Sequence, residues 1–166
     1  LSTYHNTEIV FDPSDSVIDE SKYQRRDWMS SEFGHLPAER QVPPNIPQPR
    51  GLCFTVRAKV DADHTADTVT RRSRTGFLVY VHSALVYWFS KKQTSVETSI
   101  FGSEFTAMKQ CCEYIKGLKY KLQMMSIPCD EPAYIEANNQ SVICNATIPD
   151  SFLKKNCQSI AYHIVR

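Results

Sequence analysis

The chain has 166 residues, the length of one domain or of one domain with an appendage, which excludes a two-domain enzyme. Hydrophobic residues make up 42% and charged residues 22% of the sequence, so a buried core is expected and wholesale disorder is excluded. The formal net charge is +1. Residues 1–50 carry 5 Lys and Arg against 8 Asp and Glu, whereas residues 51–166 carry 14 against 10. We therefore expect a polyanion to meet the second part first.

The sequence also bears on where the protein resides. No stretch approaches the roughly 18 apolar residues of a membrane-spanning helix, and the N-terminus lacks the basic start and apolar run of a signal peptide. Six cysteines without a C-x-x-C pair are too sparse for a disulfide scaffold. We expect reduced thiols in an intracellular protein, cytoplasmic or nuclear, with no membrane partner. The start at Leu1 and the stop at Arg166 inside an apolar-rich run predict a fragment.

Proline is concentrated near the end of residues 1–50. Five prolines fall within thirteen residues there: Pro37, Pro43, Pro44, Pro47 and Pro49. Because proline interrupts helices and central strands, residues 1–50 are predicted to be a linker or connection segment. A short polar helix over residues 15–33 is the one element expected in this irregular N-terminal extension.

Three strands are predicted after the linker. Residues 53–61 alternate strictly between apolar and polar side chains, which is the pattern of a half-buried strand. A polar loop over residues 62–75 precedes two runs rich in β-branched and aromatic residues, 77–81 and 84–89. Only two residues separate these runs, so a tight turn is expected between them. The three segments predict an antiparallel meander.

The apolar period then changes from two to between three and four. This spacing predicts a long amphipathic helix that begins near Ser99 and breaks near Gly117. Three further elements are expected: a strand over residues 134–137, the start of a helix over 140–145 and a strand over 160–165. The order of elements predicts an α/β domain with a mixed sheet over residues 51–166.

Two carboxylates stand at the ends of predicted elements. Asp61 closes the first strand on its polar face, and Glu104 lies in the first turns of the long helix. Spacing alone favours solvated side chains over a metal site. If the sheet and the helix bring them together, however, their hard oxygen ligands would suit Mg²⁺. Two such ions would let water attack a phosphodiester in line, so the chemistry would be nucleic-acid hydrolysis.

Several motifs follow one another along the chain. They are residues 60–67 (VDADHTAD), 71–77 (RRSRTGF), 84–93 (ALVYWFSKKQ), 97–108 (ETSIFGSEFTAM), 120–122 (YKL), 148–155 (IPDSFLKK) and 159–163 (SIAYH). Together they resemble the ribonuclease H region of copia-type LTR retrotransposon polyproteins. Residues 10–13 and 43–51 resemble the segment that joins the reverse transcriptase to that region. The resemblance covers most of the chain.

This resemblance implies a ribonuclease H-like mixed sheet, in which helices and strands alternate after the meander. It also implies Mg²⁺-dependent cleavage, with Mn²⁺ as an alternative ion, of the RNA strand in an RNA–DNA hybrid. The reverse transcriptase portion of the same polyprotein is the implied partner. Asp61 matches the carboxylate that ends the first strand, and Glu104 matches the helix glutamate; these two are the implied metal ligands.

The sequence departs from the family pattern at the third catalytic position. Asn138 stands where the family has the Asp of an Asp-Asn pair. An amide is nearly isosteric with a carboxylate but brings no negative charge, so weak metal binding and impaired hydrolysis are expected. Glu136, two residues earlier, is an alternative third acid. A further acid of the family falls near Ser159 or past Arg166, so a C-terminally truncated domain with an incomplete site is expected.

Two rival interpretations follow from this departure. In one, the domain is a nuclease with weakened chemistry. In the other, it is a non-catalytic retroelement remnant or adopted module that keeps the fold and at most binds nucleic acid. An unrelated α/β interaction domain is a third interpretation, which the order of the motifs disfavours.

Basic and aromatic residues complete the candidate interface. Five basic residues would suit phosphate contacts of a nucleic-acid backbone: Arg71, Arg72, Arg74, Lys91 and Lys92. The alternative is a solvated charged surface. Tyr87 and Trp88 belong to a predicted strand, where burial in the core is favoured over a platform for stacking bases.

Overall fold

The computed structural model describes residues 18–23, 26–27, 43–148 and 164–165. One short 3-10 helix, η2 (Glu20–Lys22), lies within the expected linker. The remaining elements are the strands β1 (Val56–Asp63), β2 (Arg74–Val81), β3 (Ala84–Lys92) and β4 (Tyr134–Ala137) and the helices α1 (Ile100–Met124) and α2 (Gln140–Thr147). The greater part of the helix expected over 15–33 lies outside the described residues.

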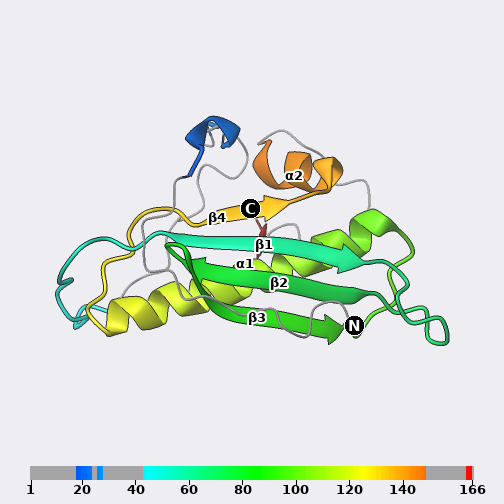
Figure 1. Ribbon diagram of the computed structural model, residues 1–166, viewed down its shortest axis with the longest axis horizontal. Coiled ribbons are helices and arrows are strands. Elements are labelled where there is room, and N and C mark those ends of the chain that lie inside the picture. Colours follow the sequence, from blue (N-terminus) through cyan, green and yellow to red (C-terminus); the bar gives the residue numbers. More distant parts are fainter. Residues whose placement is uncertain (1–17, 24–25, 28–42, 149–163, 166) are drawn as a thin grey trace, which may run out of the picture.

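The four strands form one mixed sheet in the order β3-β2-β1-β4 (Figure 1). β1, β2 and β3 pair antiparallel, and β4 pairs parallel with β1. The predicted meander and fourth strand are confirmed. The first strand begins at Val56 rather than at residue 53, because the backbone N–H of Phe54 bonds to Pro128 and the carbonyl of Thr55 bonds to His82. These residues therefore pair with loops.

The loop between the first two strands is shorter than expected. β1 continues to Asp63, which pairs with Arg74 at the start of β2, so only residues 64–73 form the hairpin tip. β3 likewise continues to Lys92 opposite Arg74. The hairpin and the end of β3 therefore bring basic residues side by side.

The helix α1 is continuous from Ile100 to Met124, and the break expected near Gly117 is wrong. One glycine costs a helix interior only about 1 kcal/mol, which the packing of the other turns outweighs. The N-cap Ser99 accepts a hydrogen bond from the backbone of Gly102. The second helix begins as expected, with Asn139 as its N-cap.

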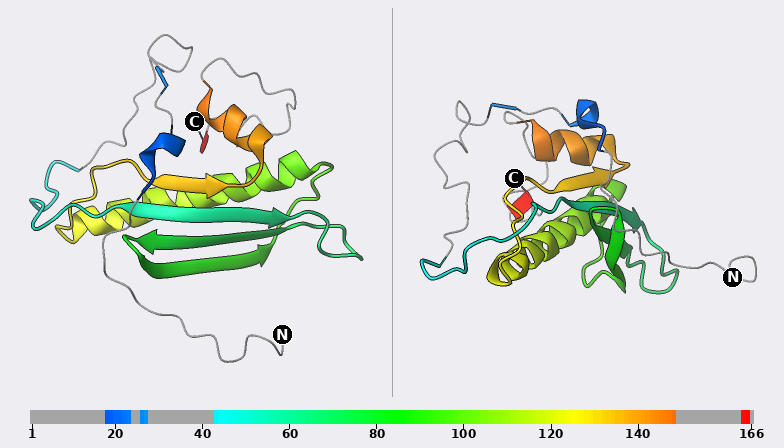
Figure 2. Two further views of the ribbon diagram at one scale, coloured as in Figure 1. Left: turned by 45° about the horizontal axis from the view of Figure 1, so that its top comes forward. Right: turned by 60° about the vertical axis from the view of Figure 1, so that its left-hand side comes forward.

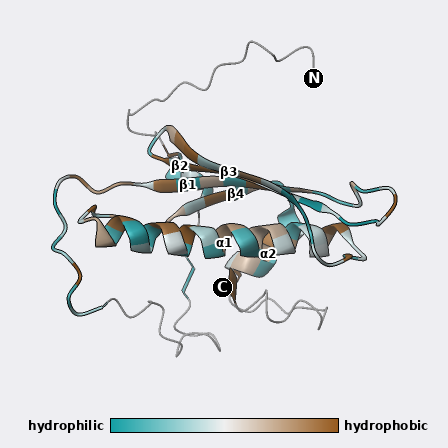
Figure 3. Ribbon diagram, turned by 90° about the horizontal axis from the view of Figure 1, so that it is seen from below, coloured by the Kyte–Doolittle hydropathy of each residue, from teal (hydrophilic) through white to brown (hydrophobic). Residues whose placement is uncertain are grey.

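Both helices pack on the same face of the sheet. Figure 3 shows the sheet on one side and α1 and α2 on the other, and Figure 2 shows α2 beside the β4 edge. Val56, Ala58 and Val60 of β1 meet Phe105 of α1 in the core, and Val142 of α2 joins them. The molecule is thus a two-layer α/β structure in which neither helix covers the second sheet face.

The C-terminal expectations are tested only in part. Residues 160–163 of the expected fifth strand, and Ser159, lie outside the described residues. Ile164 and Val165 have helical backbone, so a strand is wrong for these two residues. Within the described chain, no helix combines the length and the apolar character that crossing a bilayer requires.

Candidate functional site

The structure brings Asp61, Glu104 and Asn138 together. Asp61 lies near the end of β1, and Asn138 directly follows β4. Because β1 and β4 run parallel, their carboxyl ends meet at one edge of the sheet. The Asn138 Nδ2 donates a hydrogen bond of 3.1 Å to Asp61 Oδ1. Two residues that are 77 positions apart thus share one hydrogen bond at the point that the sequence motifs single out.

Glu104 approaches this pair from the first turns of α1. The side chain is almost enclosed, since the residue is only 7% exposed. Burial and, to a smaller extent, the negative charge of Asp61 raise the pKa of the Glu104 carboxyl, while a hydrogen bond from the backbone N–H of Ala62 opposes that rise. A buried acid beside a second carboxylate is an arrangement found at functional sites, because packing alone gives no reason for it.

A buried glutamine holds the helix against the sheet next to this site. The Gln93 Nε2 donates to Thr75 Oγ1 at 3.1 Å and to the carbonyl oxygen of Ser103 at 2.9 Å. Gln93 therefore ties β2 to the turn of α1 that carries Glu104. Sequence analysis missed this role. A polar residue between Lys92 and Thr94 gives no sign of burial, and only its three-dimensional surroundings reveal it.

The donor set decides which ions the site could hold. Mg²⁺ is typically held by one or two carboxylates together with substrate phosphates, and Asp61 and Glu104 fit one such ion. Asn138 turns its amide N–H₂ toward Asp61 and adds no negative charge. In the described part of the chain, no group of three or more His, Cys, Asp and Glu could hold a metal. Two carboxylates are donors of the kind that one hard divalent cation takes, and they are too few for a pair of such ions.

Glu136 does not act as the third acid in this arrangement. It lies on β4 opposite Lys59 of β1, and the Lys59 Nζ stands 3.6 Å from Glu136 Oε2. Its register places it one strand repeat before Asn138, away from the end of β1. Glu136, the alternative third acid named from the sequence, is thus paired with a lysine.

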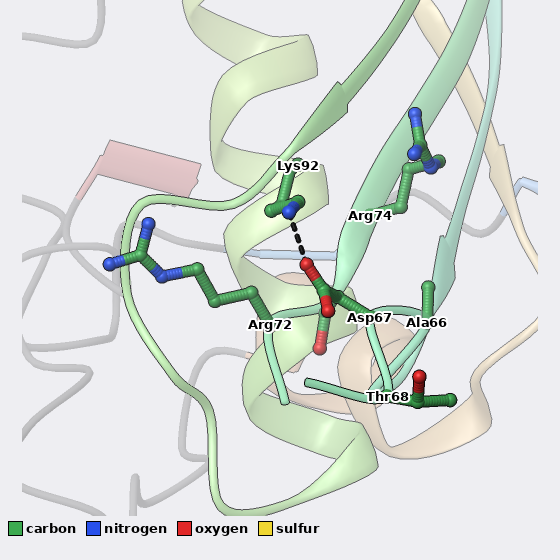
Figure 4. Close-up of a pocket in the computed structure, with 7 residues that line it drawn as sticks. Ala66, Asp67, Thr68, Arg72, Arg74 and Lys92 are labelled. Carbon is green, nitrogen blue, oxygen red and sulfur yellow. Dashed lines mark hydrogen bonds and ion pairs between the residues drawn. The ribbon is translucent and has the colours of Figure 1, made fainter. Parts of the chain in front are cut away.

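The basic residues expected to contact phosphates gather at the hairpin between β1 and β2. Asp67 organises this hairpin, because its carboxylate accepts hydrogen bonds from the backbone of Val69 and Thr70 and forms an ion pair with Lys92. These contacts lower the pKa of Asp67, the bond from Lys92 most strongly. Figure 4 shows Lys92 directed at Asp67, with Arg72 and Arg74 extending to opposite sides.

An open depression of about 300 Å³ lies between these side chains, and Asp67, Arg72, Arg74 and Lys92 are among the residues that line it. The backbone N–H of Arg71 donates a hydrogen bond to the carbonyl oxygen of Asp67. Arg71 has a positive φ of 55°. Lys91 and Arg71 are exposed. Among the described residues, no ion pair engages the other four basic residues, whereas Lys92 shares its charge with Asp67.

Tyr87 and Trp88 of β3 lie in different surroundings. Tyr87 stacks on Tyr114 with ring centroids 4.0 Å apart, as expected of a core residue. Trp88 is 66% exposed, so the expectation of a core position is wrong for it. Neighbouring residues of a strand point to opposite faces, and the helices cover only the face that carries Tyr87. Trp88 therefore stands on the open face.

The buried carboxyl of Glu104 predicts a pH-dependent stability. Because its pKa is raised, the folded protein holds this proton more tightly than the unfolded chain. Binding of this proton adds to the free energy of unfolding. The contribution is largest below the ordinary carboxyl pKa and is lost as the pH rises through the raised pKa. We expect Glu104→Gln to stabilise the protein at neutral pH by roughly 0.5–2 kcal/mol.

Urea unfolding of Glu104→Gln and of the unmodified chain tests this expectation. The difference should vanish below about pH 4, where the unfolded acid is also protonated. Glu113→Gln, in the same helix, is the matched control, because it removes only an exposed pair with Lys109. Equal stability of Glu104→Gln and the unmodified chain at both pH values would contradict the prediction.

Comparison with known proteins does not assign the chain to a family. No protein-family model matches the chain, and no solved structure matches it significantly.

Proposed function

We propose that this chain is a ribonuclease H-like domain of copia-type retrotransposon origin that binds RNA–DNA hybrids and whose hydrolysis is impaired by Asn138. The convergence of Asp61, Glu104 and Asn138 at one sheet edge carries the proposal. The resemblance assigns these three positions to one catalytic site, and their proximity in the fold supports that assignment.

The architecture supports the same proposal. An antiparallel meander, a long helix across its inner face and a fourth strand parallel to the first are the arrangement expected of a ribonuclease H-like sheet. The strand order places the carboxyl ends of β1 and β4 next to each other, which is where a ligand site forms in sheets with parallel neighbours.

Asp61 and Glu104 would hold the metal ion, which when bound supplies positive charge to activate water and to stabilise the leaving oxygen. The chain's own residues make that binding weak. The raised pKa of Glu104 means that a cation competes with a proton there. The Asn138 amide donates a hydrogen bond to Asp61 Oδ1, an oxygen that the cation would need. The amide therefore has to rotate before its own oxygen can face the cation. Hydrolysis is therefore slow, while nucleic-acid binding does not depend on these groups.

The basic hairpin would position the nucleic-acid backbone. Arg74 pairs with Asp63, two residues after Asp61, so phosphates held at the hairpin lie near the carboxylates. Arginine suits this role because its guanidinium donates two parallel hydrogen bonds to a phosphate. Contacts of this kind fix the position of the backbone without reading sequence.

Removal of the hairpin arginines tests the binding function. We expect Arg71, Arg72 and Arg74, changed together to Ala, to weaken hybrid binding and to flatten its salt dependence. The slope of log affinity against log salt should fall in magnitude by roughly 0.7–0.9 for each phosphate that the variant no longer neutralises, since each neutralised phosphate releases condensed counterions. Fluorescence anisotropy of a labelled hybrid at several salt concentrations measures the slope.

The matched control removes the same charge elsewhere. Lys116, Lys119 and Lys121 lie in the C-terminal half of α1, at the far end of the sheet from the hairpin (Figure 1). Their change to Ala should leave the slope nearly unchanged. Equal slopes for the hairpin variant and the unmodified chain would refute phosphate binding by the hairpin.

A further inference from the structure

In the described part of the chain, neither α1 nor α2 covers the second face of the sheet, which has an ordered pattern of side chains over β2 and β3. Leu78 of β2 pairs with Trp88 of β3 on one side and with Lys59 of β1 on the other. The neighbours of these residues along each strand point into the core, so all three stand on the face that neither α1 nor α2 covers (Figure 3). Trp88 is 66% exposed and Leu78 36%. An aromatic and an aliphatic side chain thus form a flat apolar platform.

The platform continues into the candidate site. Along the next row of the sheet, Asp61 pairs with Gly76, which pairs with Ser90. Gly76 has no side chain and Ser90 has a small one, so neither residue places a large side chain between Trp88 and Asp61. Strand spacing puts the Cα atoms of Trp88 and Asp61 roughly 12 Å apart. A few linked nucleotides span that distance.

Basic residues surround the platform. Lys59, which forms an ion pair with Glu136, flanks it on β1. Beyond Gly76 and Ser90, Arg74 stands opposite Lys92, which shares its charge with Asp67. The guanidinium of Arg57 lies over the Tyr80 ring, 5.3 Å from its centroid, in the row on the other side. The centre of a protein–protein interface is depleted of charged residues, whereas an aromatic platform among basic side chains is the pattern of single-stranded nucleic-acid binding.

We propose that Trp88, supported by Leu78, stacks a base of a single-stranded nucleic acid that runs across the open sheet face toward Asp61. The inference rests on the proposed function and adds to it a single-strand subsite, because a base within a duplex has both faces covered. Bases of any sequence can stack, so the subsite is indifferent to sequence. The surrounding basic side chains hold the phosphates on either side of the stacked base.

Tryptophan fluorescence tests the proposal directly. The chain has two tryptophans, so Trp28→Phe leaves Trp88 as the sole indole fluorophore. We expect a single-stranded oligouridylate or oligothymidylate to quench the emission of Trp88 saturably in the full chain. A blunt duplex of equal charge should quench it much less, since it offers no free base.

Substitutions at the platform separate stacking from charge. Trp88→Ala should weaken single-strand affinity by about 5- to 100-fold, whereas Trp88→Phe should keep most of it. Met125→Ala removes another exposed apolar side chain, at the end of α1, and should have no effect.

In an independent test, Gly76→Val places a side chain between Trp88 and Asp61. An added Cβ there lies in ordinary contact distance of two backbone oxygens, at 3.8 and 4.0 Å, and we expect the variant, once circular dichroism shows it folded, to bind single strands more weakly.

Three outcomes would overturn the inference. If the oligonucleotide leaves the intensity of Trp88 emission unchanged while the hairpin arginines still bind a hybrid, the subsite is absent and the proposed function stands. If neither a hybrid nor a single strand binds, both proposals fail. If Trp88 emission shifts with protein concentration and sedimentation shows a dimer that Trp88→Ala dissociates, a second copy of the chain covers this face instead.

Discussion

Asn138→Asp is expected to raise Mg²⁺-dependent cleavage of the RNA strand in an RNA–DNA hybrid by about 10- to 100-fold or more over the unmodified chain. The side chain of Asn138 already reaches Asp61, so the new carboxylate needs no rearrangement of the backbone. It would exchange an N–H donor for a negative charge at the point where a divalent cation lacks a third ligand. Cleavage of a labelled hybrid at a fixed Mg²⁺ concentration measures the gain.

Matched variants show whether the gain belongs to this site. Asn139→Asp makes the same chemical change one residue later and keeps the N-cap of α2, because Asp also accepts hydrogen bonds from Ser141 and Val142. It should give no gain in cleavage over the unmodified chain. Adding Asp61→Asn to Asn138→Asp should abolish the gain, since the two groups would share a metal. Strong cleavage by the unmodified chain that survives both Asp61→Asn and Glu104→Gln would place the chemistry elsewhere.

Periodicity predicted the regular elements because it reflects burial. Val56, Ala58 and Val60 alternate in the sequence and all face the core of the fold. The same reasoning failed where the partner is not a neighbouring strand. Phe54 continues the alternation, yet its backbone bonds to the loop at Pro128, which no local pattern could indicate. The break expected at Gly117 failed for an energetic reason, because the helix keeps more packing than one glycine costs.

The candidate site was accessible from the sequence only through its motifs. The resemblance that they carry implies one site for Asp61, Glu104 and Asn138. The parallel pairing of β1 with β4 explains how Asp61 and Asn138 meet, and the packing of α1 on β1 brings Glu104 near them. The contribution of Gln93 depends on burial between β2 and α1, which its own residue type does not suggest. Trp88 was assigned to the core because aromatic side chains bury a large apolar area, and the assignment failed because α1 and α2 both pack on the opposite face of the sheet.

The packing of α1 on the sheet also predicts the largest effect on stability. Phe105 is fully buried, follows Glu104 in α1 and packs against β1 and β2. Its replacement by Ala removes most of that apolar packing and leaves a cavity, which costs about 3–5 kcal/mol. That is a large share of the roughly 5–15 kcal/mol by which native domains are stable. Thermal unfolding followed by circular dichroism should show a lower midpoint, by about 2–4 °C for each kcal/mol of destabilisation.

The control for Phe105→Ala lies in the same helix. Ile100 is 59% exposed, so Ile100→Ala removes an apolar side chain that contributes little burial and should barely move the midpoint. Phe105→Leu should fall between the two, because it keeps part of the buried volume. The effect also reaches the site, since Glu104 is held near Asp61 only while this turn of α1 is packed on the sheet. Adding Phe105→Ala to Asn138→Asp should therefore lower cleavage even at temperatures where the double variant stays folded, and unchanged cleavage would show that the position of Glu104 does not depend on this packing.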